Sequence, residues 1–366
     1  MNVLCEGSVA FLERVYRHDI ALFPFTTHVQ GGGYESVYAH SRTIRSTVNC
    51  LLGMQEARKH NPSHPFLQQV ETMTARFLSL HETEIQNLGD LGLLVTLLAE
   101  SDHDSAETRR VLRTLVQRTS DEGVIRRLNL QDLTWSLWGC IAASQRGFAE
   151  AEATAHRLFQ VLSTQYHKPG EAIPRHDPSR ARGPIVSFGA SVYYVHAVYL
   201  YGQAFDCGRA MELFRRGATA LLSCQRPGGE WPWLLSCRDA RPLDIYPVFS
   251  VHQHSMAVFF LFPALEEGLS GAEGAISRSL AWVAGNNQLG TPMFQEQPFF
   301  IYRSIERKAL SARAQRYLRA RRQLVTDEAA GFVSNEEVTI NRESRSYELG
   351  WALYFLSDKP ELAGFG

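Results

Sequence analysis

The feature of this sequence that most constrains its fold is an alternation between two kinds of helical segment. Some segments, such as Leu88–Leu98 (LGDLGLLVTLL), are apolar on nearly every side. The segments between them, such as Ala106–Arg118, carry one apolar stripe and one charged face. A helix that is apolar all round must be buried, whereas a helix with a single stripe belongs at a surface. The sequence therefore predicts buried helices that alternate with surface helices.

Six apolar segments recur along the chain, and each is preceded by a striped one. They begin near Arg42, Asp90, Asp132, Gly189, Val251 and Tyr347. Their spacing is about 40 to 60 residues until the last interval, as a repeated helical hairpin would give. We predict an all-α (α/α)6 toroid, a closed ring of inner and outer helices, as one domain over 1–366 with an inserted segment at about 291–345. The rival fold is an open α-solenoid, which would expect a polar capping repeat at each end.

Charge and hydropathy exclude several partners. The formal net charge is -1 and the isoelectric point is near 6.9, so the chain has no global attraction for nucleic acid or an anionic membrane. Glu6 lies where a signal peptide would be basic, and the longest apolar run is about half of the roughly 20 residues that span a bilayer. The six cysteines are scattered without a CxxC pair. We expect a cytoplasmic protein with reduced thiols, and the sequence does not indicate its oligomeric state.

In a closed ring, the starts of the buried helices meet at one end of a central cavity. Polar side chains at these starts are therefore candidates for function. They are Arg42, Arg45, Asp90, Asp132, Ser187, Tyr193, Tyr194, Asp239, Asp244, Tyr246, His252, His254, Arg345, Tyr347 and Glu348. Aromatic residues one turn further along would line the wall, namely Trp135, Trp138, Phe249, Phe259 and Trp351.

The segment Arg216–Trp231 carries a motif. Arg216-Gly217, the apolar Leu221-Leu222, Gln225 and Gly229-x-Trp231 resemble the QW motif of terpenoid cyclases, whose toroid is shared with protein prenyltransferases. In such a motif the glutamine braces the next turn while the tryptophan stacks beside it. The resemblance implies a toroid and an isoprenoid substrate. The family's DxDD and DDxxD motifs are absent, and the residues around Cys237 do not reproduce the zinc site of prenyltransferases.

Five residues around the apolar segment at Val251 are candidates for acid–base catalysis. They are Asp239, Asp244, Tyr246, His252 and His254. Because His252 and His254 are two positions apart, they point to different sides of a helix and cannot both bind one metal ion from a regular turn. We expect one to face the cavity as a general acid or base and the other to pack. For Asp244 the alternative is a cap at a helix start.

Ten further residues are candidates for binding the substrate. They are Arg42, Trp135, Tyr194, Trp231, Trp233, Arg303, Glu306, Arg342, Tyr347 and Glu348. As a group, the arginines and their neighbours predict recognition of an anionic substrate, although Arg–Glu networks that brace a loop would give the same pattern. The basic helix Ala309–Gln323 is expected to be a solvated face.

Two enzymatic functions and one binding function follow. The resemblance favours a non-standard terpenoid cyclase-like enzyme in which Asp244 or Asp239, acting through His252, starts cyclisation. Mg²⁺ would be a cofactor only if the substrate is a diphosphate, and no other cofactor or metal is predicted. The alternative is a carbohydrate-active toroid enzyme, a lyase, epimerase or glycosidase on an anionic glycan. There Trp231 and Trp233 stack on sugar rings, and Arg303 or Arg342 holds a uronate. The third is a scaffold without catalysis.

Overall fold

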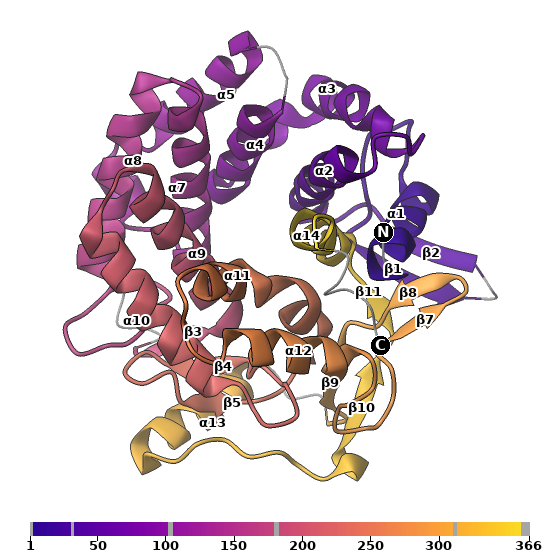
Figure 1. Ribbon diagram of the computed structural model, residues 1–366, viewed down its shortest axis with the longest axis vertical. Helices are drawn as coiled ribbons and strands as arrows, with labels where there is room; N and C mark the ends of the chain where they lie inside the picture. Colours follow the sequence, from indigo (N-terminus) through magenta and orange to yellow (C-terminus); the bar gives the residue numbers. More distant parts are fainter. Residues whose placement is uncertain (1–2, 31–32, 102–104, 179–182, 310–312, 360–366) are drawn as a thin grey trace.

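The structure is a computed structural model that describes residues 3–30, 33–101, 105–178, 183–309 and 313–359. Its helices form two concentric rings (Figure 1). The inner ring consists of α2 (Thr43–His60), α4 (Leu88–Glu100), α7 (Leu130–Gln145), α9 (Phe188–Ala204), α11 (Val258–Glu266) and α14 (Ser346–Leu356). The outer ring consists of α1 (Val3–Val15), α3 (Val70–His81), α5 (Ser105–Arg118), α8 (Ala149–Val161), α10 (Gly208–Cys224) and α12 (Ala272–Val283). The predicted toroid and its six buried segments are confirmed.

The ring closes between the first and the last inner helices. Around the ring, α2 packs on α4, α4 on α7, α7 on α9 and α9 on α11. α14 packs on the helical turn His252–Met256, which leads into α11, and on α2. At the closing contact the backbones touch, because a Cβ atom on Gly53 of α2 would overlap the carbonyl oxygen of Gly350 in α14. Gly92 and Gly139 make the same kind of contact between α4 and α7. The open solenoid is thereby excluded.

Short helices and helical turns connect the two rings. They are η1 (Leu67–Gln69), η2 (Glu82–Glu84), α6 (Glu122–Ile125), η3 (Leu162–Tyr166), η4 (His252–Met256) and η5 (Asn335–Glu337). η4 has the wider π-helical winding and leads directly into α11. α13 (Arg313–Thr326) lies outside the rings, at the lower edge of Figure 1.

Small antiparallel sheets were not predicted from the sequence. Their strands are β1 (Thr26–Gln30), β2 (Gly33–Val37), β3 (Ile185–Ser187), β4 (Leu234–Ser236), β5 (Pro242–Asp244), β6 (Val248–Phe249), β7 (Phe294–Glu296), β8 (Phe299–Ile301), β9 (Ser304–Arg307), β10 (Val338–Asn341) and β11 (Glu343–Ser344). The sheets have the orders β11-β1-β2, β10-β9-β6, β3-β4-β5 and β7-β8. Strands β3, β6 and β11 each precede an inner-ring segment, so three of the sheets lie near the end where those segments begin.

The QW-like segment fastens two outer helices together. The side-chain amide of Gln225 donates to the carbonyl oxygen of Ala275 at 3.0 Å, and the indole nitrogen of Trp231 donates to the hydroxyl of Ser279 at 2.9 Å. Trp231 is fully buried, and its ring stacks on Phe188. The segment therefore joins α10 to α12, which is a structural role in this fold.

In the part of the chain that the structure describes, no helix is both long and apolar enough to cross a membrane. The cysteines there are free thiols. The segment 291–345, predicted as an insertion, contains β7, β8, β9, α13, η5, β10 and β11.

Candidate active site

A cavity of about 760 Å³ opens at the end of the ring where the inner helices begin. Its lining comes from the first turns of α2, α4, α7, α9 and α14, from η4 and from residues of α13. This is the convergence that a closed ring predicts. Helix N-termini carry a partial positive charge, so negatively charged side chains are stabilised there.

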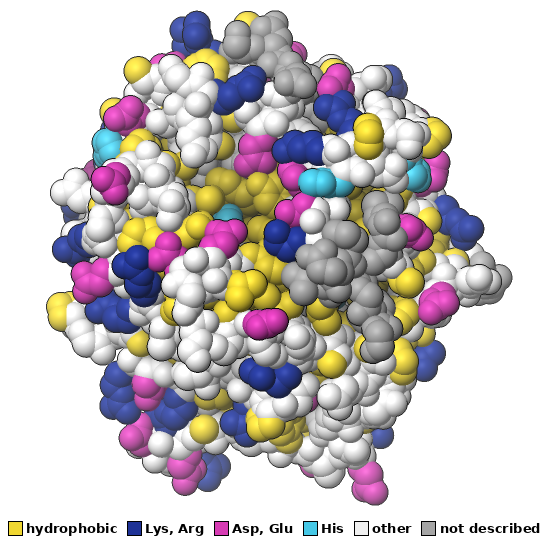
Figure 2. All heavy atoms as spheres, in the orientation of Figure 1, with side chains coloured by type: hydrophobic (Ala, Val, Ile, Leu, Met, Phe, Trp, Pro, Cys, Tyr) yellow, Lys and Arg dark blue, Asp and Glu magenta, His cyan; other side chains and the backbone are white. Residues whose placement is uncertain are grey.

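Aromatic side chains separate the cavity from the other end of the ring. Trp138, Phe259 and Trp351 are buried and contact one another. The indole nitrogen of Trp351 donates to the hydroxyl oxygen of Tyr193, which lines the cavity, at 3.1 Å. Figure 2 shows the opposite face of the ring, where the inner helices end; this face is also hollowed at its centre, with hydrophobic side chains at the bottom of the hollow. The cavity is therefore a chamber with an aromatic floor.

Two aspartates enter the cavity from adjacent inner helices in the same local structure. The tetrapeptides Asn87–Asp90 (NLGD) and Asn129–Asp132 (NLQD) begin α4 and α7. In each, the asparagine is the N-cap and its side-chain oxygen accepts from the backbone N–H of the aspartate, at 2.9 Å in α4 and 3.0 Å in α7. The capping fixes both carboxylates at the same height on neighbouring helices.

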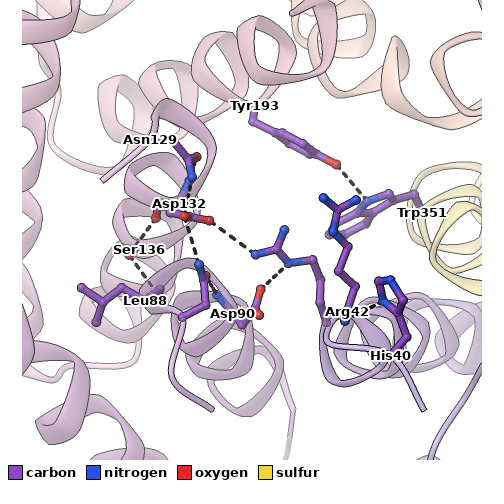
Figure 3. A network of polar contacts seen from close by, with 11 residues as sticks. His40, Arg42, Leu88, Asp90, Asn129, Asp132, Ser136, Tyr193 and Trp351 are labelled. Carbon is purple, nitrogen blue, oxygen red and sulfur yellow. Dashed lines mark hydrogen bonds and ion pairs between the residues drawn. The ribbon is translucent and has the colours of Figure 1, made fainter. Parts of the chain in front are cut away.

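A single arginine bridges the two carboxylates (Figure 3). Arg45 donates from Nε to Asp90 at 2.5 Å and from its terminal nitrogen to Asp132 at 3.5 Å. Asp132 also accepts from the amides of Asn87, at 3.0 Å, and Asn129, at 2.5 Å. A Cβ atom on Gly89 would stand 2.8 Å from the Cα atom of Asp132, so only glycine leaves room for this arrangement.

The two carboxylates have different surroundings. Burial raises the pKa of Asp90, and the charge of Arg45 opposes that shift. Asp132 accepts from three side-chain donors. A carboxyl with a raised pKa beside a second carboxyl in different surroundings is an arrangement that acid–base catalysis uses.

Trp233, His252 and Arg303 line another part of the cavity. The rings of Trp233 and His252 are nearly parallel, with centroids 5.9 Å apart. Burial lowers the pKa of His252 to about 3, so this imidazole is neutral near pH 7. No described residue hydrogen-bonds its Nδ1 atom. The partly exposed Trp233 offers a flat apolar surface to a ligand.

An ion cluster lies behind Arg303. One oxygen of Glu343 is 2.7 Å from Arg303 and 2.7 Å from Arg345. Glu348 is fully buried nearby, and no described residue hydrogen-bonds either of its carboxylate oxygens. Burial raises the pKa of Glu348 to about 8, against the opposing charges of Arg303 and Arg345. Glu348 is therefore a neutral acid at pH 7.

This cluster predicts a pH dependence of stability. The folded-state pKa of Glu348 is above the ordinary value of 4.5. Its contribution to the free energy of unfolding is therefore complete below pH 4.5 and is lost as the pH rises through about 8. Four buried histidines, His167, His196, His252 and His254, have lowered pKa values and act in the opposite direction only below pH 6.5. The pKa of Glu100, also raised by burial, is about 7. We expect Glu348→Gln to flatten the fall in the free energy of unfolding between about pH 7 and 8, measured by urea denaturation.

The exposed Glu328→Gln is the matched control for that measurement and should keep the wild-type slope. An unchanged slope in Glu348→Gln would contradict the assignment of a neutral carboxyl.

Six of the residues predicted for catalysis or substrate binding line the cavity. They are Arg42, Trp135, Trp233, His252, Arg303 and Tyr347. As expected for positions two apart, His252 faces the cavity and His254 does not. Their catalytic and binding roles stay predictions.

The other predicted site residues lie outside the cavity lining, each for a local reason. Asp239 is on an exposed turn beside Arg241, and Asp244 is buried in an ion pair with Arg319 at 3.4 Å. The hydroxyl of Tyr246 donates to Gln288 at 2.5 Å, and His254 is fully buried.

Tyr194 and Trp231 are core residues, and Glu348 lies behind Arg303. Glu306 accepts from Ser304 and Asn341, and Arg342 stacks over Tyr302. These residues were predicted to share one chamber with the others, and for them that prediction is wrong.

Sequence reasoning placed Asp90 and Asp132 at helix starts but gave them no catalytic role. The repeated pattern Asn-Leu-x-Asp was the available signal. It also missed Arg316 and Tyr317, because the basic helix was expected to face solvent, whereas these two residues line the cavity. Among the described residues, no group of three His, Cys, Asp or Glu side chains could hold a metal ion.

No protein-family model matches the sequence, and no curated protein matches it. Solved structures match its fold over nearly the whole chain. An inactive variant of an alpha-1,6-mannanase of Salegentibacter sp. HEL1_6, in complex with alpha-1,6-mannotriose, has a TM-score of 0.64 at 10% identity and covers 98% of both chains. The unsaturated glucuronyl hydrolase of Bacillus sp. GL1 has a TM-score of 0.60 at 12% identity and covers 100% of this chain and 97% of its own.

The cellobiose 2-epimerase of Bacillus thermoamylovorans B4167 has a TM-score of 0.65 at 10% identity and covers 95% of both chains. These similar structures are carbohydrate-active toroid enzymes and not terpenoid cyclases. Two predictions are therefore wrong: that the chain belongs to the terpenoid cyclase superfamily, and that its substrate is an isoprenoid. The physical reason is that the QW-like segment braces α10 against α12, a task that any toroid shares.

Proposed function

We propose that this chain is a carbohydrate-active enzyme that hydrolyses a glycosidic bond in its central cavity. The observation that carries the proposal is the pair of carboxylates, Asp90 and Asp132, held by one arginine at the starts of adjacent inner helices. Glycoside hydrolysis commonly uses two carboxyl groups with different protonation states. The similar solved structures, a mannanase and a glucuronyl hydrolase among them, support a glycan as the substrate.

In this proposal Asp90 is the acid and Asp132 is the base. The proton of Asp90 passes to the glycosidic oxygen as its bond to the anomeric carbon breaks. Asp132 accepts a proton from the water whose oxygen bonds to that carbon. Arg45 touches both carboxylates, so it holds their geometry and balances the charge as the proton moves.

Trp233 is the proposed platform for a sugar ring in this cavity, because its flat face is partly exposed there. We expect Trp233→Ala to raise KM about fivefold, with a smaller change in kcat, since a stacking contact of this kind is worth about 1 kcal/mol. Trp233→Tyr should restore most of the affinity. Steady-state kinetics on a cleaved oligosaccharide measures both, and an effect confined to kcat would contradict the assignment.

The proposed function is tested by incubating the protein with a panel of neutral and uronate-containing oligosaccharides and analysing the products by mass spectrometry. Hydrolysis adds one water to the summed mass of the products. If no member of the panel is cleaved under conditions in which it binds, the proposal is wrong.

Epimerisation is the second candidate, and His252 favours it. Its imidazole is neutral, lies in the cavity beside Trp233, and has an Nδ1 atom that no described residue hydrogen-bonds. Such a group could accept a proton from a sugar carbon. An epimerised product keeps the mass of its substrate, so the same experiment with NMR of the product separates the two reactions.

A further inference from the structure

Helix α13 joins the cavity to an outer basic surface. Arg316 and Tyr317, near its first turn, line the cavity. Ala320 is fully buried against Ile185, Leu234 and Leu243, which fixes one side of the helix on the β3-β4-β5 sheet. Arg319 also reaches Asp244, a buried carboxylate at 3.4 Å. The helix is therefore held in place by packing and by an ion pair.

The other side of α13 faces outward. Leu318, Arg321, Arg322 and Val325 are exposed. Residues three or four apart are neighbours on a helix surface, so Arg321 follows Tyr317 by one turn and Arg322 follows Leu318. The helix sequence RAQRYLRARRQLVT contains no acidic residue. Two exposed arginines, Arg321 and Arg322, thus lie on the outward side of the helix, and Arg321 is one turn beyond the cavity-lining Tyr317.

We infer that the substrate is an acidic oligosaccharide of several sugar units, whose chain leaves the cavity across α13 and is held there by Arg321 and Arg322. The inference rests on the proposed function and adds the substrate's charge and length. Two observations support the inference, charge complementarity and continuity with the cavity. Guanidinium groups pair with carboxylate and sulfate groups in two-point contacts.

An anionic membrane is the other surface that a basic helix fits. Helices that lie in a membrane interface bury a face of several bulky apolar residues. The exposed apolar side chains of α13 are Leu318, at 63%, and Val325, at 86%, and its inner face is already covered by the sheet. The glycan chain is therefore the occupant that the surface favours.

The experiment compares binding of short and long ligands by titration calorimetry. The probes are oligogalacturonates, with carboxylates, and heparin oligosaccharides, with sulfates as well, each as disaccharide and hexasaccharide, with mannohexaose as the neutral probe. Wild-type protein and the Asp132→Asn protein are both used, so that turnover does not obscure binding. We expect the hexasaccharide of at least one acidic series to bind about tenfold more tightly than its disaccharide, and the gain to weaken with salt.

The double variant Arg321→Gln with Arg322→Gln should lose most of this gain while its disaccharide affinity stays as in the wild type. The matched control is Arg146→Gln with Arg209→Gln, two exposed arginines where α7 ends and where α10 begins, at the other end of the ring, and it should keep the gain. Equal binding of mannohexaose, no acidic ligand bound, or an unchanged gain in the α13 variant would overturn the inference. So would binding of phosphatidylglycerol vesicles that the α13 variant loses without any loss of oligosaccharide binding.

Failure of the proposed function gives a different result. In that case an acidic hexasaccharide binds through α13 but is not cleaved or epimerised by the wild-type protein. Conversely, cleavage of neutral glycans without any gain from length would support the function and reject the inference.

Discussion

Replacing Asp132 by asparagine is expected to lower kcat about 100- to 10,000-fold, because it removes the group that accepts a proton in the transition state. The backbone should be little affected, since the cap of α7 is made by the side chain of Asn129 and the backbone N–H of residue 132. Substrate binding should change less than turnover, so the loss should be in kcat rather than in KM. Steady-state kinetics on a substrate found by the oligosaccharide panel measures both constants.

The matched control is Asp121→Asn. Asp121 also caps a helix, by accepting from the backbone N–H of Gly123 at 2.7 Å, but it is exposed and outside the cavity lining. It should keep wild-type kinetics. Full turnover in Asp132→Asn would contradict the role of Asp132 as the base of the proposed hydrolysis. Asp90→Asn should reduce kcat as well. In a plot of kcat against pH, the alkaline limb, which reports deprotonation of the general acid, should change.

The second large effect is expected from Gly350→Val at the closing contact of the ring. A Cβ atom at this position would overlap the backbone carbonyl of Asn49 in α2. Overpacking of a tight contact commonly costs about 1–3 kcal/mol, and a clash with backbone is at the upper end because no side chain can move away. We expect the free energy of unfolding to fall by about 3 kcal/mol in urea denaturation.

Gly208→Val is the control for the effect of a β-branched residue in a helix. Gly208 begins α10, is exposed, and has no atom near the place of an added Cβ. Its replacement should change stability by less than about 1 kcal/mol. If the two variants were equally stable, the glycine contact would not be needed for closing the ring.

The sequence allowed prediction of the ring but not of its small sheets. Helical periodicity over ten or more residues is a strong signal, and each of the six apolar segments exceeds that length when its flanks are included. Strands such as β6, Val248–Phe249, are too short to show an alternation. Pairing also joins distant segments, as when Thr27 faces Ser344, and no local pattern predicts such a partner.

The candidate site was predicted only in part, because position along a helix does not determine the side to which a residue points. Trp233 and Tyr347 line the cavity as predicted. Asp244 instead forms an ion pair with Arg319, a residue far away in sequence. The pairing of Asp90 with Asp132 needs the close contact of α4 with α7, which depends on Gly92 and Gly139. The terpenoid interpretation was wrong because a bracing motif carries information about the fold and none about the reaction.

The contact between α14 and α2 also has a consequence for how the chamber comes into being during synthesis. Arg42 and Tyr347 belong to the same wall, although almost the whole chain separates them. During translation, the first five inner segments can form only a horseshoe with an exposed apolar seam, until the residues of α14 leave the ribosome. A nascent chain halted before residue 346 should therefore bind chaperones and have no ligand affinity, whereas one released after α14 should acquire both compactness and a working pocket in a single late step.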